Sequence, residues 1–356
     1  MASVSTRTPE AKARVRRAQL LVYAGRNEVA ARQDVHLRRG IIFHGRLGAV
    51  EAAGLRSRGF TGALAVDPER YTKLNEQPPR LISDADLCAT EQATLGVSAY
   101  FAPSFATQRT QASLLSVLED GASFLSAVER TGASAPAYVS VVVTPFWLSE
   151  GLDVLETAVR DFARPIAFVF AAPFDPLGSQ AAVEGALRLI QASAGAFILR
   201  CDLSAIGLVA GGAMGGSVGA SATTRHLGMP LRNARRDRSS RDNSLHVFVP
   251  RLLSWPRGST LEHLADDLDV FVCRCGVCQG DSLLRFREAS RAVEAERHAV
   301  AAWAAIADAV LGDNDPIARW RSVLESADNA YGELEADGVA LGRPGFIRAW
   351  LSVLPA

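Results

Sequence analysis

Short apolar runs alternate with stretches of helical period over the first two thirds of the chain. Apolar residues that recur every three or four positions predict amphipathic helices, and runs rich in β-branched and aromatic residues predict strands. The predicted helices are 49–57, 113–130, 152–162 and 181–194, and the predicted strands are 20–24, 40–44, 62–67, 99–104, 138–144, 166–172, 197–202, 217–222 and 245–252. Such alternation is typical of an α/β fold with a mainly parallel sheet, and we expect a TIM-like (β/α)8 barrel. Nine strands are predicted, whereas a (β/α)8 barrel has eight. We therefore expect one of the first two predicted strands to be false or to belong to a hairpin before the barrel.

A compact set of metal-ligand residues follows the last predicted strand. Cys273, Cys275, Cys278 and His298 form the pattern Cys-x-Cys-x2-Cys-x19-His, with Gly276 giving the backbone freedom inside it. Three thiolates and one imidazole complete a tetrahedral shell for zinc, and a full shell is typical of a structural ion. We expect one structural Zn2+ per chain; the alternative is three separately buried cysteines and a surface histidine.

The last third of the chain is mostly of helical period, at 283–311, 317–334 and 344–354. We expect three parts: a flexible basic N-terminus at 1–18, the barrel at 19–256 and a zinc-binding helical subdomain at 257–356. Trp303, Trp320 and Trp350 lie on apolar helix faces and are expected in the core.

Composition narrows the class of protein. The formal net charge is zero, so the whole molecule is not a polyelectrolyte. Five cysteines, three of them grouped, are not a disulfide framework and favour a reducing cytoplasm. No signal-peptide core follows the basic N-terminus, so we expect no secretion. The uncharged segment 203–224 is rich in glycine, so we expect it to be a buried part of the core and not a membrane span. Composition leaves a homodimer and a hetero-assembly open.

A parallel barrel followed by this cysteine pattern and a helical histidine resembles the tRNA-guanine transglycosylase superfamily. The matching residues are Cys273, Cys275, Cys278 and His298. The resemblance implies a pentosyltransferase that exchanges a guanine for a 7-deazaguanine base in tRNA or DNA. It also implies that one aspartate is the nucleophile and that a second aspartate assists proton transfer.

The chain departs from that family at the nucleophile. The sequence Asp-Ser-Gly-Gly-Phe-Gln is absent, and the strand predicted before the metal site is aliphatic and contains Pro250 instead of an aspartate. Enzyme activity is therefore left open. The alternative function is a non-catalytic, zinc-stabilised barrel that binds nucleic acid or a protein partner; a barrel enzyme for a small phosphorylated metabolite is a weaker third.

Two aspartates at predicted strand ends are the candidate catalytic residues. Asp67 ends one run and Asp202 another, and the carboxyl ends of barrel strands form the active-site face. Arg200 and Asp202 point to the same side of a regular strand, so Arg200 would pair with Asp202 and keep it ionised. The alternatives are a turn residue for Asp67, and a salt bridge or helix cap for Asp202.

Residues near the predicted eighth strand are candidates for substrate binding. Gly216 and Gly219 would let the backbone approach a phosphate or a base edge, or only allow close packing. Arg200, Arg225 and His226 complete this set of candidates, because they lie at predicted strand ends.

One polar, irregular insertion carries a cluster of positive charge. Arg232, Arg235, Arg236 and Arg238 lie in residues 231–243 with few acidic neighbours. They are candidates for phosphate contacts with a nucleic acid, or form a solvated surface insertion.

Overall fold

The computed structural model describes residues 20–24, 39–45, 47–72, 82–228, 244–264 and 268–355. Two sequence-based predictions lie outside these residues: the flexible N-terminus at 1–18, and phosphate contacts by the arginines of the 231–243 insertion.

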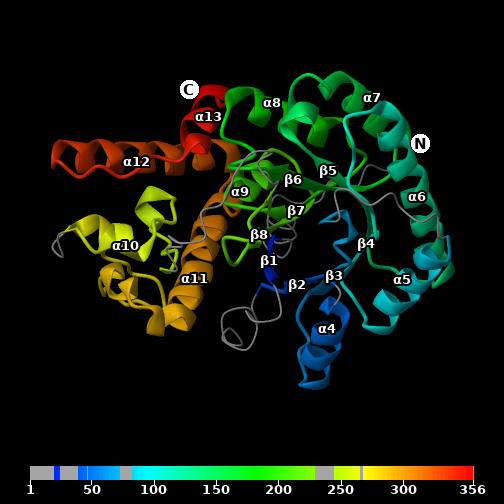
Figure 1. Ribbon diagram of the computed structural model, residues 1–356, viewed down its shortest axis with the longest axis horizontal. Coiled ribbons are helices and arrows are strands. Elements are labelled where there is room, and N and C mark those ends of the chain that lie inside the picture. Colours follow the sequence, from blue (N-terminus) through cyan, green and yellow to red (C-terminus); the bar gives the residue numbers. More distant parts are fainter. Residues whose placement is uncertain are drawn as a thin grey trace, which may run out of the picture.

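Eight parallel strands form a closed barrel (Figure 1). Each strand pairs with the next along the chain, and the last pairs with the first through Leu21 opposite Ser217. The strands are β1 (Leu20–Ala24), β2 (Ile41–His44), β3 (Leu64–Asp67), β4 (Ala99–Phe101), β5 (Ala137–Val143), β6 (Ile166–Ala172), β7 (Ala196–Cys201) and β8 (Gly215–Gly219). The predicted (β/α)8 barrel is confirmed, and both of the first two predicted strands belong to it.

From β2 to β8, a helix lies between each pair of successive strands, and these helices form an outer layer, as Figure 1 shows for α4 to α8. The amphipathic pattern places them, because each buries one apolar stripe against the sheet. In α6, for example, Leu114, Leu118 and Leu125 are buried at helical spacing. The helices of this layer are α4 (Gly48–Ser57), α5 (Ile82–Thr94), α6 (Gln111–Arg130), α7 (Leu152–Phe162), α8 (Gln180–Ala192) and α9 (Ser204–Ala210), and the four predicted ones are among them.

Alternate strand residues fill two separate cores. Tyr23, Phe101 and Phe197 belong to a cluster inside the barrel, whereas Val22 and Ile198 belong to the cluster between strands and helices. This alternation follows from the two-residue period of a strand. It directs side chains at every second position of a strand into the barrel.

The predicted ninth strand at 245–252 is wrong. Val247, Phe248 and Val249 are buried, but the segment forms only isolated antiparallel bridges and turns back at η4 (Pro250–Leu252). Pro250 has no N–H for a ladder, and its fixed φ favours the turn. The apolar run is buried beside the metal ligands, because the Phe248 carbonyl bonds His298.

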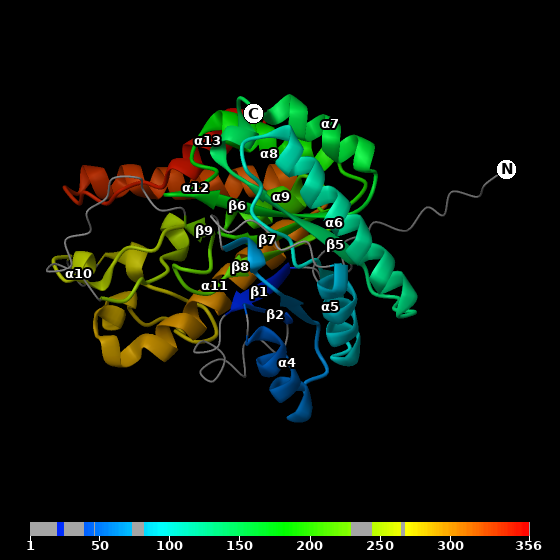
Figure 2. The ribbon, with the colours of Figure 1, turned by 45° about the vertical axis from the view of Figure 1, so that its right-hand side comes forward.

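The C-terminal helices pack on the barrel (Figure 2). α11 (Ala292–Leu311) contacts α9, and α13 (Gly345–Val353) contacts α8. The predicted helix at 283–311 begins only at Ala292, after two short 3-10 turns. Trp303, Trp320 and Trp350 are buried as predicted. The remaining elements are η1 (Arg70–Thr72), η2 (Pro145–Leu148), β9 (Leu227–Gly228), α10 (Gly258–Leu261), η5 (Asp269–Phe271), η6 (Leu283–Arg287), η7 (Ala289–Arg291) and α12 (Pro316–Ala336). In the part of the chain that the structure describes, none of the helices has the length and apolar character of a membrane span.

Candidate metal centre and barrel mouth

The three cysteines and the histidine of the predicted metal site come together. Their ligand atoms lie within 4.8 Å of one another, and His298 Nδ1 is 3.6, 3.4 and 3.2 Å from the sulfurs of Cys273, Cys275 and Cys278. Ligands of a tetrahedral ion at ordinary zinc distances are separated by about 3.5 Å to 3.8 Å. The four side chains therefore fit a metal ion.

A tight turn of the backbone aims the cysteines at one point. Gly280 N donates to the Cys273 carbonyl at 2.9 Å, and the Cys278 amide lies 3.4 Å from the Cys275 sulfur. Gln279 and Gly280 take the left-handed conformation, with φ of 53° and 104°. Gly276 is not among the positive-φ residues, so the turn depends on positions 279 and 280 and not on position 276 as predicted.

The second nitrogen of His298 decides which atom can bind the metal. Nε2 lies 2.7 Å from the Phe248 carbonyl and donates to it, so Nδ1 has its lone pair free for the ion. Such an outer hydrogen bond is common for ligating histidines. Because four protein ligands fill a tetrahedral shell, this group suits a structural metal. A cavity of about 480 Å³ lies beside Cys273 and Cys275.

Asp67 is completely buried at the carboxyl end of β3. Its Oδ2 accepts from Tyr23 at 2.7 Å and from Tyr71, and its Oδ1 accepts from the Glu69 amide at 2.9 Å. Burial raises the pKa of Asp67, while the hydrogen bonds from Tyr71 and Tyr23 oppose the rise. Burial and the Asp67 charge also raise the pKa of both tyrosines. Both carboxylate oxygens are thus engaged within the protein.

Glu69 joins two strands that are not neighbours in the barrel. Its carboxylate forms an ion pair with Arg200 at the end of β7 and accepts from His44 Nδ1 at 2.7 Å at the end of β2. Burial by itself would raise the pKa of Glu69, but His44 and Arg200 hold it below its usual value. Arg200 also donates to the Thr223 carbonyl at 2.6 Å.

The predicted pairing of Arg200 with Asp202 is wrong. Arg200 has a φ of 59°, and the register of β7 shifts between Ile198 and Cys201. This irregularity changes the side-chain alternation that the prediction assumed. Arg200 therefore pairs with Glu69, whereas Asp202 Oδ1 accepts from the Ser204 amide at 2.9 Å in the first turn of α9.

A second polar group surrounds Asp202. Burial and the charge of Asp202 raise the pKa of nearby Asp175 to about 7. Burial lowers the pKa of His226, and Asp202 opposes this shift while Arg225 and Arg200 add to it. The structure thus brings three sequence-predicted residues, Asp202, Arg225 and His226, to the carboxyl ends of β6 to β8. Arg225 lies with its guanidinium 4.1 Å from the centre of the Trp255 ring.

The two glycines proposed to bind substrate contact the chain itself. A Cβ on Gly219 would lie 2.2 Å from the Thr224 carbonyl carbon, and one on Gly216 would lie 3.2 Å from Ile198 Cβ. Both positions therefore need a small residue for backbone packing. Ligand binding by them stays a prediction.

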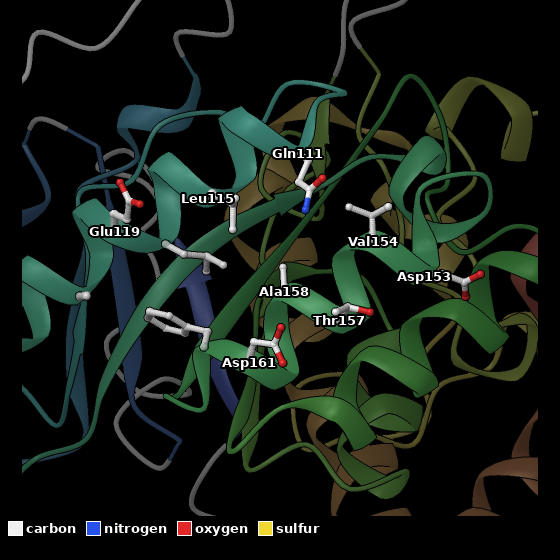
Figure 3. A pocket seen from close by; sticks show the side chains of 11 residues that line it. Gln111, Leu115, Glu119, Asp153, Val154, Thr157, Ala158 and Asp161 are labelled. Carbon is white, nitrogen blue, oxygen red and sulfur yellow. The ribbon is translucent and has the colours of Figure 1, made fainter.

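One groove lies away from the barrel mouth. It has a volume of about 570 Å³ and runs between α6 and α7 (Figure 3). Leu115 and Val154 are partly exposed there, and Glu119, Asp153 and Asp161 also line it. None of the predicted site residues lines this groove.

Sequence reasoning missed Tyr23, His44, Glu69 and Tyr71. All four belong to one hydrogen-bonded network with Asp67 and Arg200. His44 ends a predicted strand, and that position was a usable signal. Glu69 gave none, since it lies two residues beyond a strand in a turn.

Comparisons with known proteins find only distant structural similarity. No protein-family model matches this chain, and the comparison with curated proteins finds no significant match. Among solved structures, the carboxyl transferase domain of Rhizobium etli pyruvate carboxylase with 3-bromopyruvate or 3-hydroxypyruvate is similar at 12% identity and a TM-score of 0.38, over 93% of this chain. The same domain with pyruvate is similar at 12% identity and a TM-score of 0.36. The chain spans 56% to 62% of the length of these structures.

Proposed function

We propose that this protein is a zinc-stabilised barrel enzyme that exchanges a guanine or deazaguanine base in RNA or DNA, with Asp202 as the nucleophile. The observation that supports this function is the polar group around Asp202 at the carboxyl ends of β6 to β8, the face on which barrel enzymes carry their active sites. The closed Cys3His group beside the barrel agrees with the resemblance from which the chemistry is drawn.

The donor set supports zinc as the metal. Three thiolates and one imidazole in a closed tetrahedral arrangement suit zinc better than magnesium or calcium, which prefer oxygen ligands. Cys273, Cys275, Cys278 and His298 would hold the ion, and its role is to stabilise the packing of this segment against α11. In this proposal the metal takes no part in the reaction, and the catalytic residues lie at the barrel mouth.

Charge distribution favours Asp202 over Asp67 as the nucleophile. Asp67 has three donors on its two oxygens and no exposed surface. Asp202 is partly exposed, and it lies near cationic Arg225. Burial and the charge of Asp202 raise the pKa of Asp175 to about 7, so Asp175 is only partly ionised beside Asp202 at neutral pH. Asp202 would attack the sugar C1′ and release the base, and the incoming base would reverse this step.

A specific observation favours a second candidate, a barrel that binds nucleic acid without catalysis. Asp202 accepts from the Ser204 amide, and Asp175 accepts from the Leu177 amide at 3.0 Å. Each carboxylate therefore has a local structural role that needs no substrate.

Base exchange with labelled guanine separates the two functions. Wild-type protein, Asp202→Asn and Asp67→Asn are incubated with guanine and either tRNA or duplex DNA. Asparagine at 202 can accept the same hydrogen bond from Ser204, so the fold is kept while the anionic nucleophile is removed. We expect exchange in wild type and a loss of at least about 10³-fold in Asp202→Asn.

Asp86→Asn is the matched control, since Asp86 lies on the exposed surface of α5 and pairs with Arg130. Exchange that persists in Asp202→Asn at the rate of this control rejects Asp202 as the nucleophile. Absence of exchange in wild type on both nucleic acids favours the non-catalytic barrel.

A further inference from the structure

His44 is held at the barrel mouth by a carboxylate. It is the last residue of β2, and its Nδ1 lies 2.7 Å from Glu69 Oε2. A carboxylate of lowered pKa can only accept a hydrogen bond, so Nδ1 carries the proton. In the neutral ring, Nε2 then has a free lone pair.

The surroundings fix the orientation of this imidazole. The ring stacks on Tyr23 with centroids 4.9 Å apart and planes inclined by 9°. Arg200 holds Glu69 from the other side, and the Glu69 amide bonds Asp67 Oδ1 at 2.9 Å. Glu69 and Arg200 both have left-handed backbone, with φ of 53° and 59°. Strained backbone of this kind persists where the surrounding structure holds it, and it is frequent at active sites.

The second nitrogen of His44 distinguishes it from a histidine with a structural role. Nε2 is buried and has no hydrogen-bond partner among the described residues. His298, by contrast, uses both nitrogens: Nδ1 faces the cysteine sulfurs, and Nε2 bonds the Phe248 carbonyl. A buried ring nitrogen without a partner is costly unless it serves a ligand.

We propose that His44 is a catalytic residue, a general acid and base whose Nε2 exchanges a proton with the ring nitrogen of a purine or 7-deazapurine base. This inference rests on the proposed function, and it supplies the proton-transfer group that fully bonded Asp67 does not provide. Glu69 is a positioning residue, because it acts through His44. Arg200 is a positioning residue in the same sense, because it holds Glu69.

The step balances in both directions. As Asp202 Oδ forms its bond to C1′, the bond from C1′ to the base nitrogen breaks and its electron pair stays on that nitrogen. When His44 starts as the imidazolium, with a proton on each ring nitrogen, it gives its Nε2 proton to the base nitrogen and becomes neutral. An incoming base then gives its N–H proton to Nε2, its nitrogen bonds C1′, and the bond to Asp202 breaks with its electrons returning to the carboxylate.

Variants of His44 test this role through the kinetics of guanine exchange. We expect His44→Gln to lower kcat by about 10²- to 10⁴-fold with little change in KM. His44→Ala should lose as much, and added imidazole should restore part of kcat. His263→Gln is the matched control, because His263 is exposed and lies outside the barrel mouth. A variant that keeps kcat within threefold of this control, or a loss that imidazole does not restore in folded His44→Ala, overturns the assignment.

A measurement that needs no turnover separates this inference from the proposed function. If wild-type protein exchanges no guanine, the proposed function fails, and His44 is judged from its ¹⁵N NMR signals as guanine is added. We expect a proton on Nδ1 in the free protein and a change in the Nε2 shift when guanine binds. An unchanged Nε2 signal at saturating guanine overturns the role of His44.

Discussion

Glu69 and Arg200 form an ion pair across the mouth of the barrel, and both have left-handed backbone. Glu69 follows β3 and Arg200 lies in β7, with β2, β1 and β8 between them in the sheet. The pair therefore connects distant parts of the barrel wall. It also places the carboxylate against His44, so the local geometry of the mouth depends on it.

Removal of the Glu69 charge should destabilise the fold in a pH-dependent way. Glu69→Gln leaves Arg200 buried without its anion, and we expect a cost of about 3 kcal/mol at pH 7. Because the folded pKa of Glu69 is lowered, its contribution is present above the usual value of 4.5 and is lost as the pH falls through the folded pKa. Urea unfolding of wild type and variant at pH 7 and at pH 3 should show the difference shrinking at low pH.

The matched control for that measurement is Glu129→Gln. Glu129 pairs with Arg164 on the surface, where both side chains are largely exposed. We expect a change of less than about 1 kcal/mol. Equal effects of the two substitutions would contradict a special role for the ion pair at the mouth.

Substitution of one cysteine should release the metal. Cys275→Ser removes one of three thiolates, and we expect less than one bound zinc per chain by elemental analysis and a loss of more than about 4 kcal/mol in stability. Cys88→Ser is the control, since Cys88 lies on α5 outside the cluster and should keep the metal. Wild-type protein that contains no metal when purified without chelator would rule out this site.

Gly219 should tolerate no side chain. In Gly219→Ala the new Cβ would lie 2.2 Å from the Thr224 carbonyl carbon, so the backbone must shift at a cost of about 1–3 kcal/mol. Gly332→Ala is the control, because this exposed position of α12 has open space around it, and alanine there should stabilise by roughly 0.5–1 kcal/mol. A Gly219→Ala protein of unchanged melting temperature would show that the close approach is relaxed in solution.

The arginines of the 231–243 insertion should control affinity for nucleic acid. If Arg232, Arg235, Arg236 and Arg238 contact phosphates, replacing all four by glutamine should weaken binding of duplex DNA and flatten its salt dependence by about 3–4 units of log–log slope. Fluorescence anisotropy at about 50 to 200 mM salt measures both the affinity and the slope of its salt dependence. Substituting four exposed arginines of the barrel, Arg130, Arg160, Arg164 and Arg188, is the charge-matched control. Equal slopes for the two quadruple variants would make the insertion an ordinary solvated surface.

The sequence by itself determined the barrel and the metal ligands. Most of the barrel strands were visible as separate apolar runs, because strands buried on both faces need apolar residues at almost every position, although β8 reads Gly-Gly-Ser-Val-Gly. The metal ligands were equally clear, since three cysteines this closely spaced, followed by a histidine on a helix, are typical of a metal site. The run at 245–252 was wrongly predicted as a strand. A buried segment without a strand partner shows the same run of apolar residues as a buried strand.

Only the tertiary structure decided what the polar residues at the strand ends do. Arg200 points to Glu69 because β7 is irregular at that residue, and an irregularity depends on neighbouring strands rather than on local composition. Asp67 is enclosed by two tyrosines, one from β1 and one from η1, which approach it only when the barrel closes. The free Nε2 of His44 and its bond to Glu69 depend on contacts made across strands. The local sequence pattern indicates which residues are buried and whether they repeat with the period of a helix or a strand. Hydrogen bonds between residues far apart in the chain form only when the sheet closes into a barrel.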